Sequence, residues 1–147
     1  MRRFIFLAAL AASAPAFAMD DAGFQKKYSA AVQLYIDSWN SKNLDALAAI
    51  YAPDGVFISA TGQVLRGQEI RKFVEAEYAN TEHDLVSSPT EVHRIGDAAY
   101  AFGNGSVLVG DKNLKISFNW AGAYALDGDK IAIKMLAISI PPPPPPK

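Results

Sequence analysis

Residues 28–57 read YSAAVQLYIDSWNSKNLDALAAIYAPDGVF, and this segment has the clearest pattern in the 147-residue chain. Its first half continues a series of apolar residues that recurs every three or four positions: Phe24, Tyr28, Val32, Tyr35, Ile36 and Trp39. That spacing places all of them on one side of an α-helix. An aspartate at position 20 or 21 can cap the N-terminus. We therefore predict a helix from there to about residue 42.

The second half of the segment predicts a shorter helix and its end. Asn43 is a favourable N-cap residue, and Asp45 follows in the first turn, where a negative charge stabilises the helix dipole. The predicted buried side consists of Leu44, Leu47, Ile50 and Tyr51. We predict that Pro53-Asp54-Gly55 ends this helix as a turn, with the Asp54 side chain capping the turn backbone.

Downstream of this segment the pattern changes twice. A short hairpin is predicted at 56–65 around Ala60-Thr61-Gly62, and a third helix at 68–78. From residue 83 the apolar residues alternate, which predicts strands at 83–94, 98–109, 114–126 and 131–140. The segments between these strands are too short for parallel crossovers, so we expect antiparallel pairing.

The predicted strand at 114–126 has two unlike faces. One carries Ile116, Phe118, Trp120, Gly122 and Tyr124, and the other carries Lys115, Ser117, Asn119, Ala121 and Ala123. The large aromatic face is suited to packing against helices. The predicted fold class is therefore α+β, with three N-terminal helices packed on a strongly curved antiparallel sheet. A bent sheet covered by helices leaves a hollow, whose mouth is a common ligand site.

Several segments resemble the nuclear-transport-factor-2-like superfamily, most closely its ketosteroid isomerase and SnoaL-like branch, including exported members of unknown function. The resemblance is carried by residues 28–40, 43–47 and 51–57, and it continues through Gly62 and residues 66–70. It is specific in the first half of the chain and architectural in the second. It implies a cone-shaped fold with an internal pocket, and commonly a homodimer built through the sheet.

The resemblance transfers only part of the isomerase chemistry. Tyr35 stands where ketosteroid isomerases have a tyrosine that donates a hydrogen bond to the substrate oxygen. The position of their general base falls at Ser59, whose hydroxyl is far too weakly basic to accept a proton from carbon. The position of their second oxyanion donor, a protonated aspartic acid, falls at Gly122. We therefore expect no steroid isomerase activity by that mechanism.

The candidate ligand-binding residues are mostly aromatic: Tyr35, Trp39, Tyr51, Phe57, Ser59, Phe118 and Trp120. Aromatic residues at such spacing also form ordinary cores, and the Tyr35 hydroxyl could simply bind a backbone partner. The catalytic candidates are Tyr35 and His83, because a histidine at a pocket mouth titrates near neutral pH. Lys134 interrupts an apolar strand and could pair with a carboxylate, reach the rim or act as a pocket cation.

Composition narrows the function classes. The 14 basic and 15 acidic side chains nearly balance, so no basic excess indicates a nucleic-acid partner. The chain has no cysteine, which excludes thiol nucleophiles and disulfides. Its 2 histidines are far apart in the sequence and do not suggest a metal site. No phosphate-binding glycine loop occurs, so we predict neither metal nor cofactor.

The two ends of the chain differ from the domain at 19–140. Residues 1–18 combine a positive start at Arg2-Arg3, an apolar run and a small-x-small motif at Ala16-Phe17-Ala18, which together predict a secretory signal peptide. The apolar run is shorter than the roughly 20 residues of a membrane span. We therefore expect an exported protein, periplasmic or secreted, with no stable membrane span after cleavage. Residues 141–147 are predicted to form a polyproline tail.

Three functions are compatible with these patterns. The first is binding of a small hydrophobic, oxygen-bearing molecule, which is suggested by Tyr35 and the aromatic residues. The second is an isomerase, cyclase or dehydratase with a rearranged acid–base set such as His83 with Tyr35. The third is a dimeric interaction module without a pocket, suggested by the small-residue face at 115–125.

Overall fold

The computed structural model describes residues 21–79, 82–127 and 130–142. The predicted signal peptide at 1–18 and residues 143–147 of the predicted tail lie outside these ranges. The described elements are α1 (Asp21–Asn40), α2 (Leu44–Ala48), β1 (Tyr51–Ile58), β2 (Val64–Arg66), α3 (Gln68–Ala79), β3 (Glu82–Ile95), β4 (Ala98–Val109), β5 (Leu114–Asp127) and β6 (Lys130–Ser139). The three helices, the hairpin and the four later strands occur in the predicted order. The second helix is shorter than predicted: it ends at Ala48, and Tyr51, which was predicted on its buried side, begins β1 instead.

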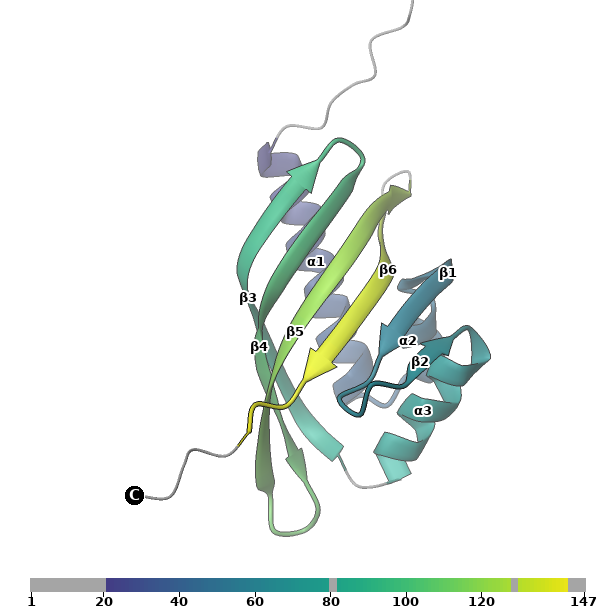
Figure 1. The fold of residues 1–147 in the computed structure, drawn as a ribbon, viewed down its shortest axis with the longest axis vertical. Helices are drawn as coiled ribbons and strands as arrows, with labels where there is room; N and C mark the ends of the chain where they lie inside the picture. Colours follow the sequence, from purple (N-terminus) through teal and green to yellow (C-terminus); the bar gives the residue numbers. More distant parts are fainter. Residues whose placement is uncertain (1–20, 80–81, 128–129, 143–147) are drawn as a thin grey trace, which may run out of the picture.

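The strands form one open sheet in the order β2-β1-β6-β5-β4-β3 (Figure 1). Four of the five pairings are antiparallel, as predicted. The exception is the parallel pairing of β1 with β6, which makes the sheet mixed. The prediction of an entirely antiparallel sheet rested on turns between consecutive strands, and such turns contain no information about two strands at opposite ends of the chain.

The helices lie on one face of the sheet, and α1 crosses it diagonally (Figure 1). Phe24, Tyr28 and Trp39 from the predicted apolar stripe are buried, whereas Tyr35 is only partly buried. The Tyr28 ring meets the Tyr124 ring of β5 edge to face, with centroids 5.2 Å apart. Such aromatic pairs add to the stabilisation from area burial alone. The stripe therefore fixes α1 on the sheet.

The end predicted for the second helix was also wrong, because Pro53-Asp54-Gly55 is not a turn but lies inside β1. The pairing register with β6 shifts between Tyr51 and Val56, so the segment is a bulge in the strand. A Cβ atom on Gly55 would lie 2.8 Å from the Ala52 carbonyl oxygen and 2.9 Å from that of Ile133. Asp54 does not cap a turn, because its carboxylate pairs with Lys134 on β6. The turn-forming residues thus accommodate a bulge.

Two glycines on β4 determine how close the aromatic rings of β5 can come. Gly103 is paired with Trp120, and Gly105 with Phe118. A Cβ on Gly103 would lie 2.7 Å from the Trp120 ring, and one on Gly105 would lie 2.6 Å from the Phe118 ring. Both contacts are closer than side chains tolerate. The two rings can therefore lie across β4 only because these positions have no side chain.

Candidate functional site

A cavity of about 320 Å³ lies between the helices and the inner face of the sheet. All of the predicted ligand-binding residues line it: Tyr35, Trp39, Tyr51, Phe57, Ser59, Phe118 and Trp120. They come from α1, from β1 and the turn after it, and from β5. The helical stripe and the strand alternation bring them together, because each pattern turns its side chains toward the same space.

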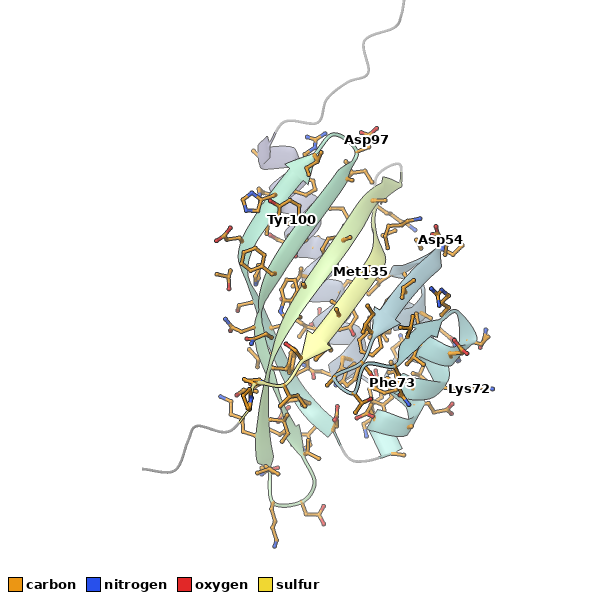
Figure 2. All side chains as sticks on the ribbon, in the orientation of Figure 1. Asp54, Lys72, Phe73, Asp97, Tyr100 and Met135 are labelled. Atoms are coloured by element: carbon orange, nitrogen blue, oxygen red, sulfur yellow. The ribbon has the colours of Figure 1, made fainter. Side chains whose placement is uncertain are left out.

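Aromatic contacts shape the cavity wall. The Tyr35 and Trp39 rings stack with centroids 6.5 Å apart, and Phe57 meets Phe73 of α3 at 5.3 Å. Figure 2 shows Phe73 on the side of α3 that faces the sheet, while Lys72 beside it projects away. Phe73 also lines the cavity. The wall is therefore built from aromatic rings on both sides of the space.

Tyr35 and Tyr51 form a pair of phenols in this wall. Burial raises the pKa of both hydroxyls above the usual value of 10.0, so both are neutral at physiological pH. A hydrogen-bond interaction with Tyr51 partly opposes the rise in the pKa of Tyr35. Both neutral hydroxyls therefore keep a proton that an acceptor atom in the cavity could receive as a hydrogen bond.

Ser59 lines the cavity but also holds the β1–β2 hairpin. Its side chain is buried, its hydroxyl lies 2.9 Å from the Thr61 hydroxyl, and it accepts a hydrogen bond from the Gln63 backbone N–H at 3.2 Å. None of these groups is a base. Among the described residues, the hydrogen-bond partners of the serine therefore include none that could activate it for proton abstraction.

Gly122 is covered by a neighbouring side chain. A Cβ atom on Gly122 would lie 2.5 Å from the Tyr124 hydroxyl oxygen, so the Tyr124 ring folds back over the glycine. Tyr124 lines the cavity. Burial raises its pKa, which leaves a neutral phenol beside the position where the resemblance had indicated an acid.

Two carboxylates that sequence reasoning missed, Glu77 and Glu82, also line the cavity. Glu77 lies in α3 and Glu82 begins β3, and both side chains are partly buried. Burial raises the pKa of Glu82 to about 8, and its interaction with the neighbouring Glu77 side chain adds to the rise. Glu77 lies seven residues after Ile70, so both residues are on the apolar side of α3. This helical spacing was the sequence signal that could have placed Glu77 toward the cavity.

His83 lies outside the cavity lining. Its Nδ1 is 3.0 Å from the Asp84 carboxylate, and the histidine side chain is 38% exposed. Glu82, its chain neighbour, points into the wall instead. Lys134 is likewise not a lining residue, because it pairs with Asp54 across β1 and β6. The predicted combination of His83 with Tyr35 is therefore not assembled around the cavity.

Metal-binding clusters and membrane-spanning helices are both absent from the described ranges. No group of three or more histidine, aspartate or glutamate side chains there could hold a metal ion. Among the same residues, no helix is long and apolar enough to cross a membrane.

Comparison with known proteins places this architecture in a family. Residues 32–133 match the model of the SnoaL-like domain. No curated protein shows a significant match to the sequence.

Solved structures with the same fold are distant in sequence. A domain of unknown function with a cystatin-like fold from Nostoc punctiforme superposes with a TM-score of 0.72 at 16% identity, covering 85% of this chain and 81% of that one. An NTF2-like protein of unknown function from Shewanella oneidensis superposes with a TM-score of 0.68 at 17% sequence identity, covering 78% of this chain and 98% of that one. A ketosteroid isomerase-like protein from Erwinia carotovora superposes with a TM-score of 0.69 at 15% sequence identity, covering 80% of this chain and 96% of that one.

At these identities the structural likeness establishes the fold alone. The family match extends over more than half of the chain, from α1 to β6. The chain therefore belongs to the SnoaL-like domain family.

Proposed function

We propose that this chain is an exported protein that binds a small, largely apolar, oxygen-bearing molecule in the cavity between α1, α3 and the sheet. The observation that carries the proposal is the cavity of about 320 Å³ lined by aromatic rings together with the Tyr35 hydroxyl. Cavities of this size with few, convergent polar groups are typical of small-molecule sites. The predicted signal peptide supports the exported location.

The phenol pair supports an oxygen acceptor on the ligand. Tyr35 and Tyr51 line the cavity as neutral phenols, and a carbonyl, ether or hydroxyl oxygen of a ligand could accept a hydrogen bond from the Tyr35 hydroxyl. A buried donor that gains an acceptor contributes about 0.5–1.5 kcal/mol net. Tyr35 would therefore orient the ligand, while the aromatic wall would supply most of the binding energy.

The proposal does not include ketosteroid isomerase chemistry. Ser59 occupies the position of the base and is engaged in the hairpin turn. Gly122 occupies the position of the second acid and is covered by Tyr124. The cavity also argues against the alternative of an interaction module without a pocket.

A matched pair of probes tests the proposal. Acetylnaphthalene and isopropylnaphthalene have nearly the same shape, but only the ketone can accept a hydrogen bond. We expect both probes to bind. We expect Tyr35→Phe to lower the affinity for the ketone about three- to tenfold and to leave the affinity for the hydrocarbon unchanged. Tyr100→Phe, on the outer face of the sheet, is the control variant. Isothermal titration should detect the difference, and failure of both probes to bind the unaltered protein would contradict the proposal.

A second candidate function is acid–base catalysis, and Glu82 is the observation that favours it. Its carboxyl lines the same cavity as Tyr35, and burial raises its pKa to about 8, which makes its ionised form a stronger base than an ordinary carboxylate. It would take the role for which the sequence had suggested His83. Glu82 would remove a proton from a carbon next to a ligand carbonyl, and Tyr35 would stabilise the enolate oxygen.

Hydrogen–deuterium exchange tests this second candidate without knowledge of the natural substrate. In D₂O, proton removal from the acetyl methyl group of acetylnaphthalene and return of a deuteron would label that group. We expect exchange above the buffer rate, and its loss in Glu82→Gln but not in Glu75→Gln, whose glutamate is exposed on α3. An unchanged exchange rate in Glu82→Gln would exclude this role for the residue.

The third element of the proposal is a homodimer that forms through the outer face of the sheet. Tyr100, Phe102 and Met135 on this face are 44%, 39% and 36% exposed, and we call them the outer apolar patch. In the pairing register, Ala123 of β5 lies between Tyr100 and Met135, and Ala121 is paired with Phe102. Figure 2 shows Tyr100 and Met135 on the sheet, whose other face carries α1. Exposed aromatic residues beside small ones are suited to close packing against a second copy.

A further inference from the structure

The charge inside the cavity has one sign. Among the described residues that line it, the ionisable acids are Glu77 and Glu82, and none is a lysine, arginine or histidine. The nearest histidine in the chain, His83, is turned to Asp84. The Lys42 ammonium lies over the Tyr78 ring, 6.0 Å from its centroid, and Lys42 is not a lining residue.

The two carboxyls lie next to each other in the cavity wall. Glu82 begins β3 close to the end of α3, and its carboxyl interacts with that of Glu77. Burial and this neighbour raise the pKa of Glu82 to about 8. Neither glutamate forms an ion pair with a cationic side chain within the described part of the chain.

A ligand that covers this pair displaces the water that stabilises its charge. Both side chains are partly exposed, so water reaches them when the cavity is empty. Covering an unpaired charge with apolar atoms is costly, whereas a ligand that carries a positive charge replaces the lost hydration with an ion pair. A ligand with its own negative charge would meet repulsion and would find no cation in the lining.

The rest of the wall is also compatible with a cation. Tyr35, Trp39, Trp120 and Tyr124 present aromatic rings to the same space, and aromatic rings attract ammonium groups through their negative faces. The same rings exclude water from the apolar body of a ligand. An amphipathic cation would therefore satisfy both parts of the cavity.

We infer that the ligand of this cavity is a lipophilic amine, whose ammonium group binds at Glu77 and Glu82 and whose apolar body lies among the aromatic side chains. The inference rests on the proposed function, because it names the chemical class of the molecule bound at the same site. The oxygen acceptor for Tyr35 remains part of the ligand, so an oxygen-bearing amine fits the whole wall.

Three probes of matched size and different charge test this assignment. Naphthylethylamine is a cation at pH 7, naphthylethanol is neutral and naphthylacetate is an anion. We expect the amine to bind about tenfold more tightly than the alcohol, in keeping with the strength of hydrogen bonds to charged groups, and the acetate to bind most weakly. Titration calorimetry at low and moderate salt would measure the three affinities.

The variant Glu77→Gln/Glu82→Gln removes the charge and keeps the shape of both side chains. We expect it to lose the preference for the amine and to bind the alcohol as before, while the control Glu75→Gln on the exposed side of α3 keeps the preference. Binding of the alcohol as tightly as the amine by the unaltered protein would overturn the inference and leave the proposed function standing. An amine preference that survives in the double variant would also overturn it. Binding of none of the three probes would overturn both proposals.

Discussion

Asn40, the last residue of α1, binds both backbone polar groups of Leu85 in β3. Its side-chain oxygen accepts from the Leu85 N–H at 2.7 Å, and its side-chain nitrogen donates to the Leu85 carbonyl at 3.1 Å. The β3 register shifts at this point, and Asp84 adopts a positive φ of 53°. The asparagine thus takes the place of the strand partner that the shift removes, and it joins the end of α1 to the bent start of β3.

Replacing Asn40 should therefore lower the stability of the whole domain. We expect Asn40→Ala to reduce the free energy of unfolding by about 1–3 kcal/mol, because two backbone groups lose their partner. The stability of Asn40→Asp should lie between those of the unaltered protein and Asn40→Ala, because aspartate keeps the hydrogen-bond acceptor and loses the donor. Urea denaturation would measure the changes. Gln33→Ala, which removes an exposed hydrogen bond to Asp37, is the control and should have little effect.

The raised pKa of Glu82 predicts a pH-dependent stability. An unfolded glutamate titrates near 4.5, whereas in the folded protein the pKa of Glu82 is about 8. Between these values the folded chain keeps a proton that the unfolded chain releases, so the free energy of unfolding decreases as the pH rises. The slope is at most about 1.4 kcal/mol per pH unit for one proton, and less because solvent reaches the half-buried carboxyl.

Denaturation from pH 5 to pH 9 would reveal this dependence. Glu82→Gln should give a flatter curve and should be more stable than the unaltered protein at the alkaline end. Glu75→Gln serves as the matched variant and should follow the unaltered curve. Parallel curves for Glu82→Gln and the unaltered protein would contradict the assignment of this proton to Glu82.

The close contact between Gly105 and the Phe118 ring predicts an overpacking effect. Gly105→Ala would put a methyl group 2.6 Å from that ring, so we expect a loss of about 1–3 kcal/mol in the free energy of unfolding. Phe118→Leu should partly relieve the collision, so the double variant should lose less stability than the sum of the two single variants. Additive losses would show that the ring does not determine the cost, because the added methyl group would also lie 2.7 Å from the Val86 carbonyl oxygen. Thermal and urea denaturation of the four proteins would complete this cycle.

The outer apolar patch predicts a concentration-dependent assembly. We expect the unaltered protein to sediment as a dimer and Phe102→Lys to sediment as a monomer, because a charge in the middle of an apolar interface is costly. Leu114→Lys, at an exposed position at the start of β5, is the control and should remain dimeric. A monomer for the unaltered protein at high concentration would contradict the proposed dimer.

The sequence predicted those parts of the fold that depend on local patterns. The apolar spacing of α1, the Asn43 cap and the alternation in β5 each act over a few residues, and each element appeared where it was expected. Pro53-Asp54-Gly55 was misinterpreted, because its residues favour a turn locally and the strand partner of this segment is distant in sequence. Asp54 and Lys134, which join β1 to β6, are 80 positions apart.

The same distinction applies to the site. The aromatic lining was predictable because helix and strand periodicity turn those side chains inward. The positions of Glu77 and Glu82 in the lining were not predictable. A glutamate near the edge of a helix face is usually solvated, and the contact between Glu77 and Glu82 depends on how α3 and β3 pack together. His83 was chosen for its intrinsic pKa, yet its neighbour Glu82 has the side chain that lines the cavity.

The position of β6 has a consequence for how the chain matures. This last strand lies between β1 and β5, so it is the element that connects the N-terminal hairpin to the three-stranded meander. Until residues 130–139 have been synthesised, β1 and β5 each have an open edge on the side that β6 will occupy. The sheet therefore cannot be completed before these residues have been made and can pair with both β1 and β5.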